Sequence, residues 1–200
     1  MKSKKMITGK IVSAALIFAL SASLTACGSN IENNTDKKSN TESSEDAGAS
    51  STDTEDVNVN ISDKEKEFST DDMKITLNED FSTDKLDNFD MYVSSNYCIG
   101  LFLKETKDEV TAADGSLSSL DDYVNNIMTK SQIQADVSEY NENTRFFSWD
   151  KEINDTTYKY AAYASERGDS YYLVQFVTTV PAFDKLKDTF NKFYDSFEAN

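Results

Sequence analysis

Three stretches of different hydrophobic pattern follow one another along the chain: an apolar run near the start, a long polar stretch, and a mixed region from residue 68 to the end. In the mixed region, several segments alternate apolar and polar residues at a period of two, as half-buried strands do. We predict strands at residues 73–77, 89–93, 97–104 and 146–153. Residues 157–165 and 170–180 are predicted to form a β-hairpin around Glu166-Arg167-Gly168-Asp169, because glycine adopts the positive φ of a tight turn.

One helix is predicted between these strands, over residues 120–130. Ser119 is a good N-cap, and Asp121 and Asp122 fall in the first turn, where the helix dipole favours anions. The apolar stripe of this helix consists of Leu120, Val124, Ile127 and Met128.

A second helix is predicted to begin at Pro181, the only proline of the chain, because proline is tolerated in a first helical turn. Val180 should therefore end the preceding strand, since proline cannot continue a ladder. Large apolar residues then recur at helical spacing, at Phe183, Leu186, Phe190, Phe193 and Phe197.

The start of the chain has the pattern of a secretory signal. Lysines precede an uncharged apolar run over residues 11–24, which is shorter than the about 20 apolar residues that span a bilayer. Leu24-Thr25-Ala26-Cys27 follows, and it resembles the lipobox of bacterial lipoproteins. We therefore predict that residues 1–26 are removed as a lipoprotein signal peptide and that the Cys27 thiol takes a diacylglyceryl group. The alternatives are a plain secretory signal and an uncleaved N-terminal anchor.

Residues 27–67 begin with the cysteine that we expect to be lipidated and continue as a polar stretch dominated by Ser, Thr, Asn and acidic residues. Such a composition buries too little apolar surface to offset the entropy of ordering, so we predict a disordered linker. Residues 57–61 alternate briefly, but we favour linker over edge strand there. Residues 68–200 are predicted to form a single domain.

Composition and charge restrict the partners. Once Cys27 is alkylated, Cys98 is the only remaining thiol, so an intramolecular disulfide is excluded. The signal removes four of the 20 basic residues and none of the 36 acidic ones, which leaves a formal charge of −20 on the mature chain. This charge repels nucleic acid and anionic head groups, so we expect no nucleic-acid partner and a membrane attachment supplied by the lipid.

The order of these elements resembles the PsbP/Mog1-like superfamily, whose bacterial members include small lipoproteins. The residues that carry the resemblance are Lys-Ile-Thr-Leu-Asn-Glu-Asp-Phe at 74–81, Leu120-Asp121-Asp122-Tyr123, Gly168-Asp169-Ser170-Tyr171-Tyr172 and Ser196-Phe197. The resemblance implies an α+β fold over residues 68–200, with a central antiparallel sheet and helices packed on both faces. It also implies an accessory or protein-binding role, and it carries over no functional residue, because its motifs are structural.

Catalytic chemistry has few candidates in this chain. The absence of histidine excludes a Ser-His-Asp or Cys-His arrangement within the chain. Cys98 lies in a dense apolar segment, where a thiol is inert. Asp121 and Asp122 fit a helix start better than a proton-sharing pair. We therefore expect no catalytic residue, no metal and no cofactor, and a protein that is not an enzyme.

Two surfaces are candidates for binding. Arg167-Gly168-Asp169 spells an adhesion tripeptide at the predicted hairpin tip, although these are also ordinary turn residues. The hairpin strands are rich in tyrosine, at Tyr158, Tyr160, Tyr163, Tyr171 and Tyr172. We place Tyr158, Tyr160 and Tyr172 on one face and the other two on the opposite face. These tyrosines either pack in the core or form a binding surface.

We conclude that the sequence indicates a lipid-anchored, non-enzymatic binding or accessory module on the extracytoplasmic face of a bacterial membrane, with a protein partner at the cell surface. The alternative is a carrier of a peptide, glycan or hydrophobic ligand with an aromatic-lined pocket.

Overall fold

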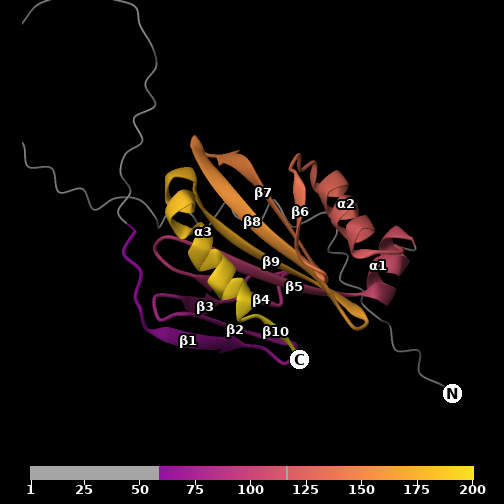
Figure 1. Cartoon of the computed structure of the whole chain (residues 1–200), viewed down its shortest axis with the longest axis horizontal. Helices are drawn as coiled ribbons and strands as arrows, with labels where there is room; N and C mark the ends of the chain where they lie inside the picture. Colours follow the sequence, from indigo (N-terminus) through magenta and orange to yellow (C-terminus); the bar gives the residue numbers. More distant parts are fainter. Residues whose placement is uncertain (1–58, 116) are drawn as a thin grey trace, which may run out of the picture.

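A seven-stranded antiparallel sheet forms the centre of the computed structural model, which describes residues 59–115 and 117–200 (Figure 1). Its strand order is β3-β4-β5-β9-β8-β7-β6. The strands are β3 (Ser82–Asp84), β4 (Met91–Ser94), β5 (Ile99–Thr106), β6 (Val137–Asn141), β7 (Thr144–Ile153), β8 (Thr156–Arg167) and β9 (Ser170–Thr179). Strands β5, β9 and β8 lie at the middle; β5 and β9 are buried over most of their length and β8 over its central half, as expected of strands covered on both faces.

One face of this sheet is covered by helix α3 (Val180–Asp195) and by a small second sheet. The small sheet has the order β1-β2-β10, formed by β1 (Glu65–Ser69), β2 (Met73–Asn78) and β10 (Glu198–Ala199). Side chains from both covering elements and from the large sheet form one core, which we call the α3 core. Phe176 of β9 stacks on Phe190 of α3 there, with ring centroids 5.0 Å apart.

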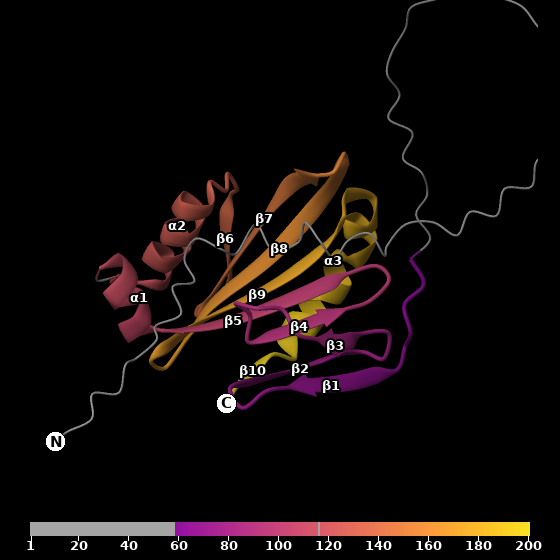
Figure 2. The ribbon, with the colours of Figure 1, turned by 180° about the vertical axis from the view of Figure 1, so that it is seen from behind.

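The opposite face is covered by helices α1 (Lys107–Asp114) and α2 (Leu120–Ser131), and the two views from opposite sides agree on this arrangement (Figure 2). A second core, which we call the α2 core, lies between these helices and the sheet. Helix α1 buries only Val110, whereas α2 buries Leu120, Tyr123, Val124 and Ile127. No helix of the described residues is long and apolar enough to cross a membrane.

The predicted fold class is therefore confirmed: the domain is α+β, with an antiparallel sheet and helices on both faces. The hairpin is also confirmed, because β8 and β9 pair across a two-residue turn in which Gly168 has a φ of +58°. Ser119 caps α2 as predicted, and its side chain accepts a hydrogen bond from the Asp122 N–H.

Two predicted boundaries are wrong. Val180 is the first residue of α3 rather than the last of the strand, and Thr179 occupies the N-cap, so proline sits inside the first turn. The predicted linker extends too far, because β1 already begins at Glu65 and Val59 and Ile61 pack against the α3 core. The charged, exposed residues of this edge strand made it look like linker. Predictions for residues 1–58, including the signal peptide and Cys27, lie outside the described residues.

Candidate functional site

A small cleft opens between α2 and the edge strand β6, on the α2 side of the large sheet. Its volume is about 260 Å³, and it is lined by Asp121, Val124, Asn125, Val137, Ser138, Glu139 and Arg145. Small-molecule sites commonly measure about 300–1,000 Å³, so this cleft suits one side chain or a small group better than a cofactor. Its lining combines two valines with charged side chains of both signs.

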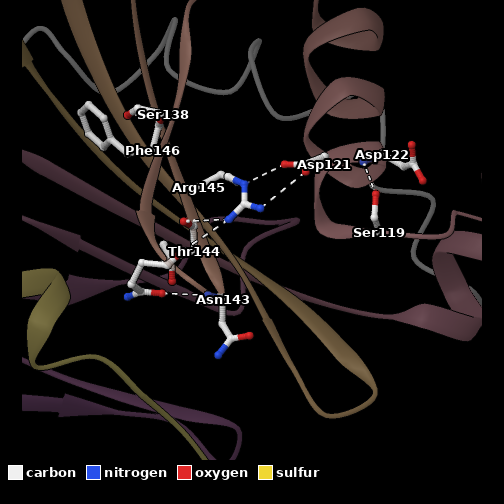
Figure 3. A network of polar contacts seen from close by, with 9 residues as sticks. Ser119, Asp121, Asp122, Ser138, Asn143, Thr144, Arg145 and Phe146 are labelled. Atoms are coloured by element: carbon white, nitrogen blue, oxygen red, sulfur yellow. Dashed lines mark hydrogen bonds and ion pairs between the residues drawn. The ribbon is translucent and has the colours of Figure 1, made fainter.

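Arg145 of β7 forms one wall of the cleft by reaching across to α2 (Figure 3). Its Nε lies 2.7 Å from Oδ1 of Asp121, and its Nη2 lies 3.5 Å from Oδ2, so the guanidinium contacts both carboxylate oxygens. Its Nη1 donates to the carbonyl oxygens of Asn141 and Thr144. The hydrogen bond with Asp121 raises the pKa of Arg145, which is a permanent cation in any case, and the four contacts of the guanidinium fix its position.

The neighbouring carboxylates Asp121 and Asp122 have separate roles. Oδ2 of Asp122 accepts hydrogen bonds from the backbone N–H and the hydroxyl of Ser118, and these bonds lower the pKa of Asp122. Asp121 instead pairs with Arg145. The predicted structural role of this pair at the helix start therefore holds for Asp122, while Asp121 also shapes the cleft.

Strand β6 forms the other wall of the cleft, and among the described residues it pairs with β7 alone. Tyr140 anchors it on the α3 side, where the hydroxyl donates to Oδ1 of Asp195 at 2.6 Å and the ring packs edge-on against Tyr163. On the cleft side, Val137 is 39% exposed and is the large hydrophobic residue that the described surface leaves most open. A bulge between Glu139 and Asn141 limits the regular pairing to the first residues of the strand.

The tyrosines predicted as a binding surface belong mostly to the cores. Tyr160, Tyr163, Tyr171 and Tyr172 are each at most 3% exposed, and only Tyr158 is half-buried. Tyr163 stacks on Tyr194 of α3, and Tyr171 stacks on Tyr123 of α2. Of the two alternatives that the sequence left open, core packing therefore holds for four of the five tyrosines, and only Tyr158 is accessible enough to contribute to a binding surface.

The predicted division of these tyrosines between the faces is wrong. Tyr158, Tyr160 and Tyr171 face the α2 core, whereas Tyr163 and Tyr172 face the α3 core. The two-residue turn pairs Arg167 with Ser170, so even-numbered residues of β8 lie opposite odd-numbered residues of β9. This register places Tyr171 of β9 on the same face of the sheet as Tyr158 and Tyr160 of β8.

The tip of the hairpin holds Arg167, Gly168 and Asp169, all three exposed as predicted. Two contacts fix it against α1: the Lys107 N–H donates to the Asp169 carbonyl at 2.9 Å, and Lys107 forms an ion pair with Glu166. The Arg167 guanidinium lies 5.8 Å from the centre of the Phe197 ring. The tripeptide is therefore a well-anchored turn, and an adhesion role for it remains a prediction.

Glu105 of β5 is a buried carboxyl that the sequence analysis did not single out. It is 8% exposed, and the Tyr123 hydroxyl donates to its Oε2 at 2.7 Å. Burial raises the pKa of Glu105, and the hydrogen bond from Tyr123 opposes part of the rise. The residue lies at the α2 core, apart from the cleft.

Cys98 is buried, as predicted, and its thiol contacts the carbonyl oxygen of Ile99. A wider groove of about 920 Å³ lies along the segment between β3 and β4, beside the β1–β2 turn. Its lining includes Leu86, Phe89 and Tyr92 together with the carboxylates of Asp84, Asp87 and Asp90. None of these residues was predicted as a site.

No protein-family model and no curated protein matches this sequence. Among solved structures, the chain is similar to a protein from Bacteroides thetaiotaomicron, with a TM-score of 0.46, 7% identity and coverage of 64% of this chain and 45% of that one. This chain therefore spans less than half of that protein.

Two further structures are similar over a comparable part of the chain. One is the cyanobacterial PsbP protein CyanoP from Synechocystis, with a TM-score of 0.42, 10% identity and coverage of 68% of this chain and 93% of that one. The other is LpqN, a Mycobacterium tuberculosis protein involved in cell envelope biogenesis, with a TM-score of 0.41, 8% identity and coverage of 69% and 86%.

Proposed function

We propose that this protein is a non-enzymatic binding or accessory module, held by a lipid on Cys27 at the extracytoplasmic face of a bacterial membrane, and that it binds a protein partner. The observation that carries the binding role is the α2–β6 cleft beside the exposed Val137. Both faces of the sheet are filled by side chains of the two cores, so the edge of the sheet is the part left for recognition.

The residues available for chemistry support binding over catalysis. The chain has no histidine, and the Cys98 thiol is buried. Glu105 is enclosed with Tyr123 in the α2 core, where a substrate would have to displace packed side chains. The lipid anchor is supported by the basic start, the apolar run and the Leu24-Thr25-Ala26-Cys27 motif.

Expression of the full chain in a bacterium tests both parts of this proposal. Mass spectrometry of the membrane fraction should find a chain that begins at a diacylated Cys27, and Cys27→Ser should abolish this species. Chemical crosslinking in the same cells should join the wild-type protein to an envelope protein. An unmodified chain that begins elsewhere contradicts the anchor, and the absence of any crosslinked protein contradicts the binding role.

A ligand carrier is the second candidate, and the groove along β3 and β4 favours it. Its volume lies within the range of small-molecule sites, and Phe89 and Tyr92 contribute aromatic lining. This aromatic lining differs from the one that the sequence predicted, because the hairpin tyrosines are in the cores. Native mass spectrometry of protein purified from cells should reveal a bound small molecule that Phe89→Ala loses, if the protein is a carrier.

A further inference from the structure

We propose that the β6 edge and its cleft bind an extended, basic segment of a partner protein, which adds to β6 as a strand and inserts a lysine or arginine side chain between β6 and α2. This inference rests on the proposed binding function and specifies the chemistry of its partner.

The backbone of β6 provides the first part of the argument. As the last strand of the seven-stranded sheet, β6 has one strand neighbour among the described residues. An edge strand presents backbone N–H and C=O groups that an extended peptide can pair with, and side-chain pockets beside it then give specificity. The bulge after Glu139 confines regular pairing to a short stretch, which protects the edge from indiscriminate association.

The cleft provides the second part, because its shape and chemistry fit a long cationic side chain. Val137, which is 39% exposed, offers an apolar surface to an aliphatic stem, while Val124 lines the cleft but is only 1% exposed. Asp121 and Glu139 contribute carboxylates to the lining. Lysine and arginine bury their stems along apolar surface while the charged head remains at a polar rim. The volume of about 260 Å³ is below the usual range for drug-sized ligands but suits a single side chain.

Charge decides which partner fits. The exposed segment from residue 136 to 142 carries Asp136, Glu139 and Glu142 and no basic residue. The one cation of the cleft lining, Arg145, is paired with Asp121 and lies opposite Glu139 in the β6–β7 register, so the lining holds two carboxylates and one cation. A second copy of the mature chain, with a formal charge of −20, would bring the same acidic edge against this one, so a basic partner is favoured over self-association.

Fluorescence anisotropy with the full mature chain in detergent micelles tests the proposal. The probes are two labelled heptapeptides, one of alternating valine and lysine and one of alternating valine and glutamate. We expect the basic peptide to bind at least about tenfold more tightly than the acidic one, because like charges at an interface are strongly unfavourable. Equal binding of the two peptides would overturn the inference.

Matched variants then locate the site. Glu139→Lys should weaken binding of the basic peptide by about tenfold, whereas Glu65→Lys, the same change on the exposed edge strand β1, should leave it unchanged. Equal effects of the two variants would mean that binding depends only on the net charge of the protein, which would contradict the proposed binding site at the cleft. Both glutamates are exposed, so unchanged melting curves are expected for both variants.

A backbone-methylated form of the basic peptide separates strand addition from simple side-chain insertion. N-methylation removes the peptide's N–H donors, so strand addition predicts a loss of binding and increased hydrogen-exchange protection of residues 137–139 with the unmethylated peptide only. Undiminished binding of the methylated peptide would overturn strand addition. If neither heptapeptide binds while the intact protein still crosslinks to an envelope protein in cells, this inference fails and the proposed function stands.

Discussion

The two faces of the large sheet are closed in different ways. The α3 face is covered by a 16-residue helix and by a second sheet, and α3 alone buries Ala182, Phe183, Leu186, Phe190, Phe193 and Tyr194. The α2 face is covered by two shorter helices, one of which buries a single residue. On this face a cleft remains open between α2 and β6. The same face also holds the buried carboxyl of Glu105. The comparison indicates that the α3 face contributes more buried apolar surface to stability, and the recognition surface that we propose lies on the α2 face.

The largest expected effect is on the α3 face. Phe190 is fully buried and stacks on Phe176, so Phe190→Ala should lower the free energy of unfolding by about 3–5 kcal/mol. Lys187→Ala on the exposed side of the same helix should change it little. Urea denaturation measures the free energy of unfolding of both variants. Similar small losses would show that the packing of α3 contributes little to the stability of the domain.

A matched pair of leucines compares the two faces directly. Leu186 of α3 is 0% exposed and Leu120 of α2 is 6% exposed. Leucine-to-alanine changes in cores cost about 2–5 kcal/mol, and we expect Leu186→Ala near the upper end and Leu120→Ala near the lower end. A greater loss from Leu120→Ala, measured by the same denaturation, would reverse the assignment of stability to the α3 face.

The buried carboxyl on the α2 face predicts a pH dependence. Burial raises the folded pKa of Glu105, so its contribution to stability is fully present below the ordinary carboxyl pKa and is lost as pH rises through the raised pKa. Glu105→Gln should remove this loss, which makes the variant as stable as wild type near about pH 4 and more stable near about pH 7. Thermal melts across this range measure the difference. If Glu105→Gln were less stable than wild type, and most so at the higher pH, the predicted direction of the pH dependence would be wrong.

The smallest stability effect is expected at the cleft itself. The ion pair between Arg145 and Asp121 is partly exposed, with Asp121 59% accessible, and such pairs contribute about 0–1 kcal/mol. Arg145→Lys keeps the charge but loses the two-point contact with the carboxylate. Urea denaturation should therefore show little change, and a loss above about 2 kcal/mol would mean that this pair is structural.

The sequence predicted the elements whose pattern is complete within a short window. Helix α2 carries a cap and an apolar stripe, and the β8–β9 hairpin carries a glycine turn between two apolar strands. Helix α1 was missed although Thr106 and Glu109 form a capping box, because its single buried residue leaves no stripe. Strand β1 was missed because four of its five residues are exposed.

The candidate site was harder to predict, because it depends on contacts between distant segments. Arg145 and Asp121 are 24 positions apart, and neither position has a local pattern that predicts the pair. One signal was available: Arg145 is one of two arginines in a strongly acidic chain. The faces of Tyr171 and Tyr172 were assigned wrongly, although the two-residue turn determines them. Counting the strand register outward from Gly168-Asp169 would have given the observed faces.

Site-specific photo-crosslinking in living cells tests the central claim most directly, because it compares the β6 edge with the aromatic hairpin in the intact protein. A photoreactive phenylalanine replaces Val137 in one variant, Tyr158 in a second, and the exposed Asp188 of α3 in a control. The account predicts that position 137 captures a discrete envelope protein and that positions 158 and 188 do not. Capture from position 158 without capture from position 137 would contradict it.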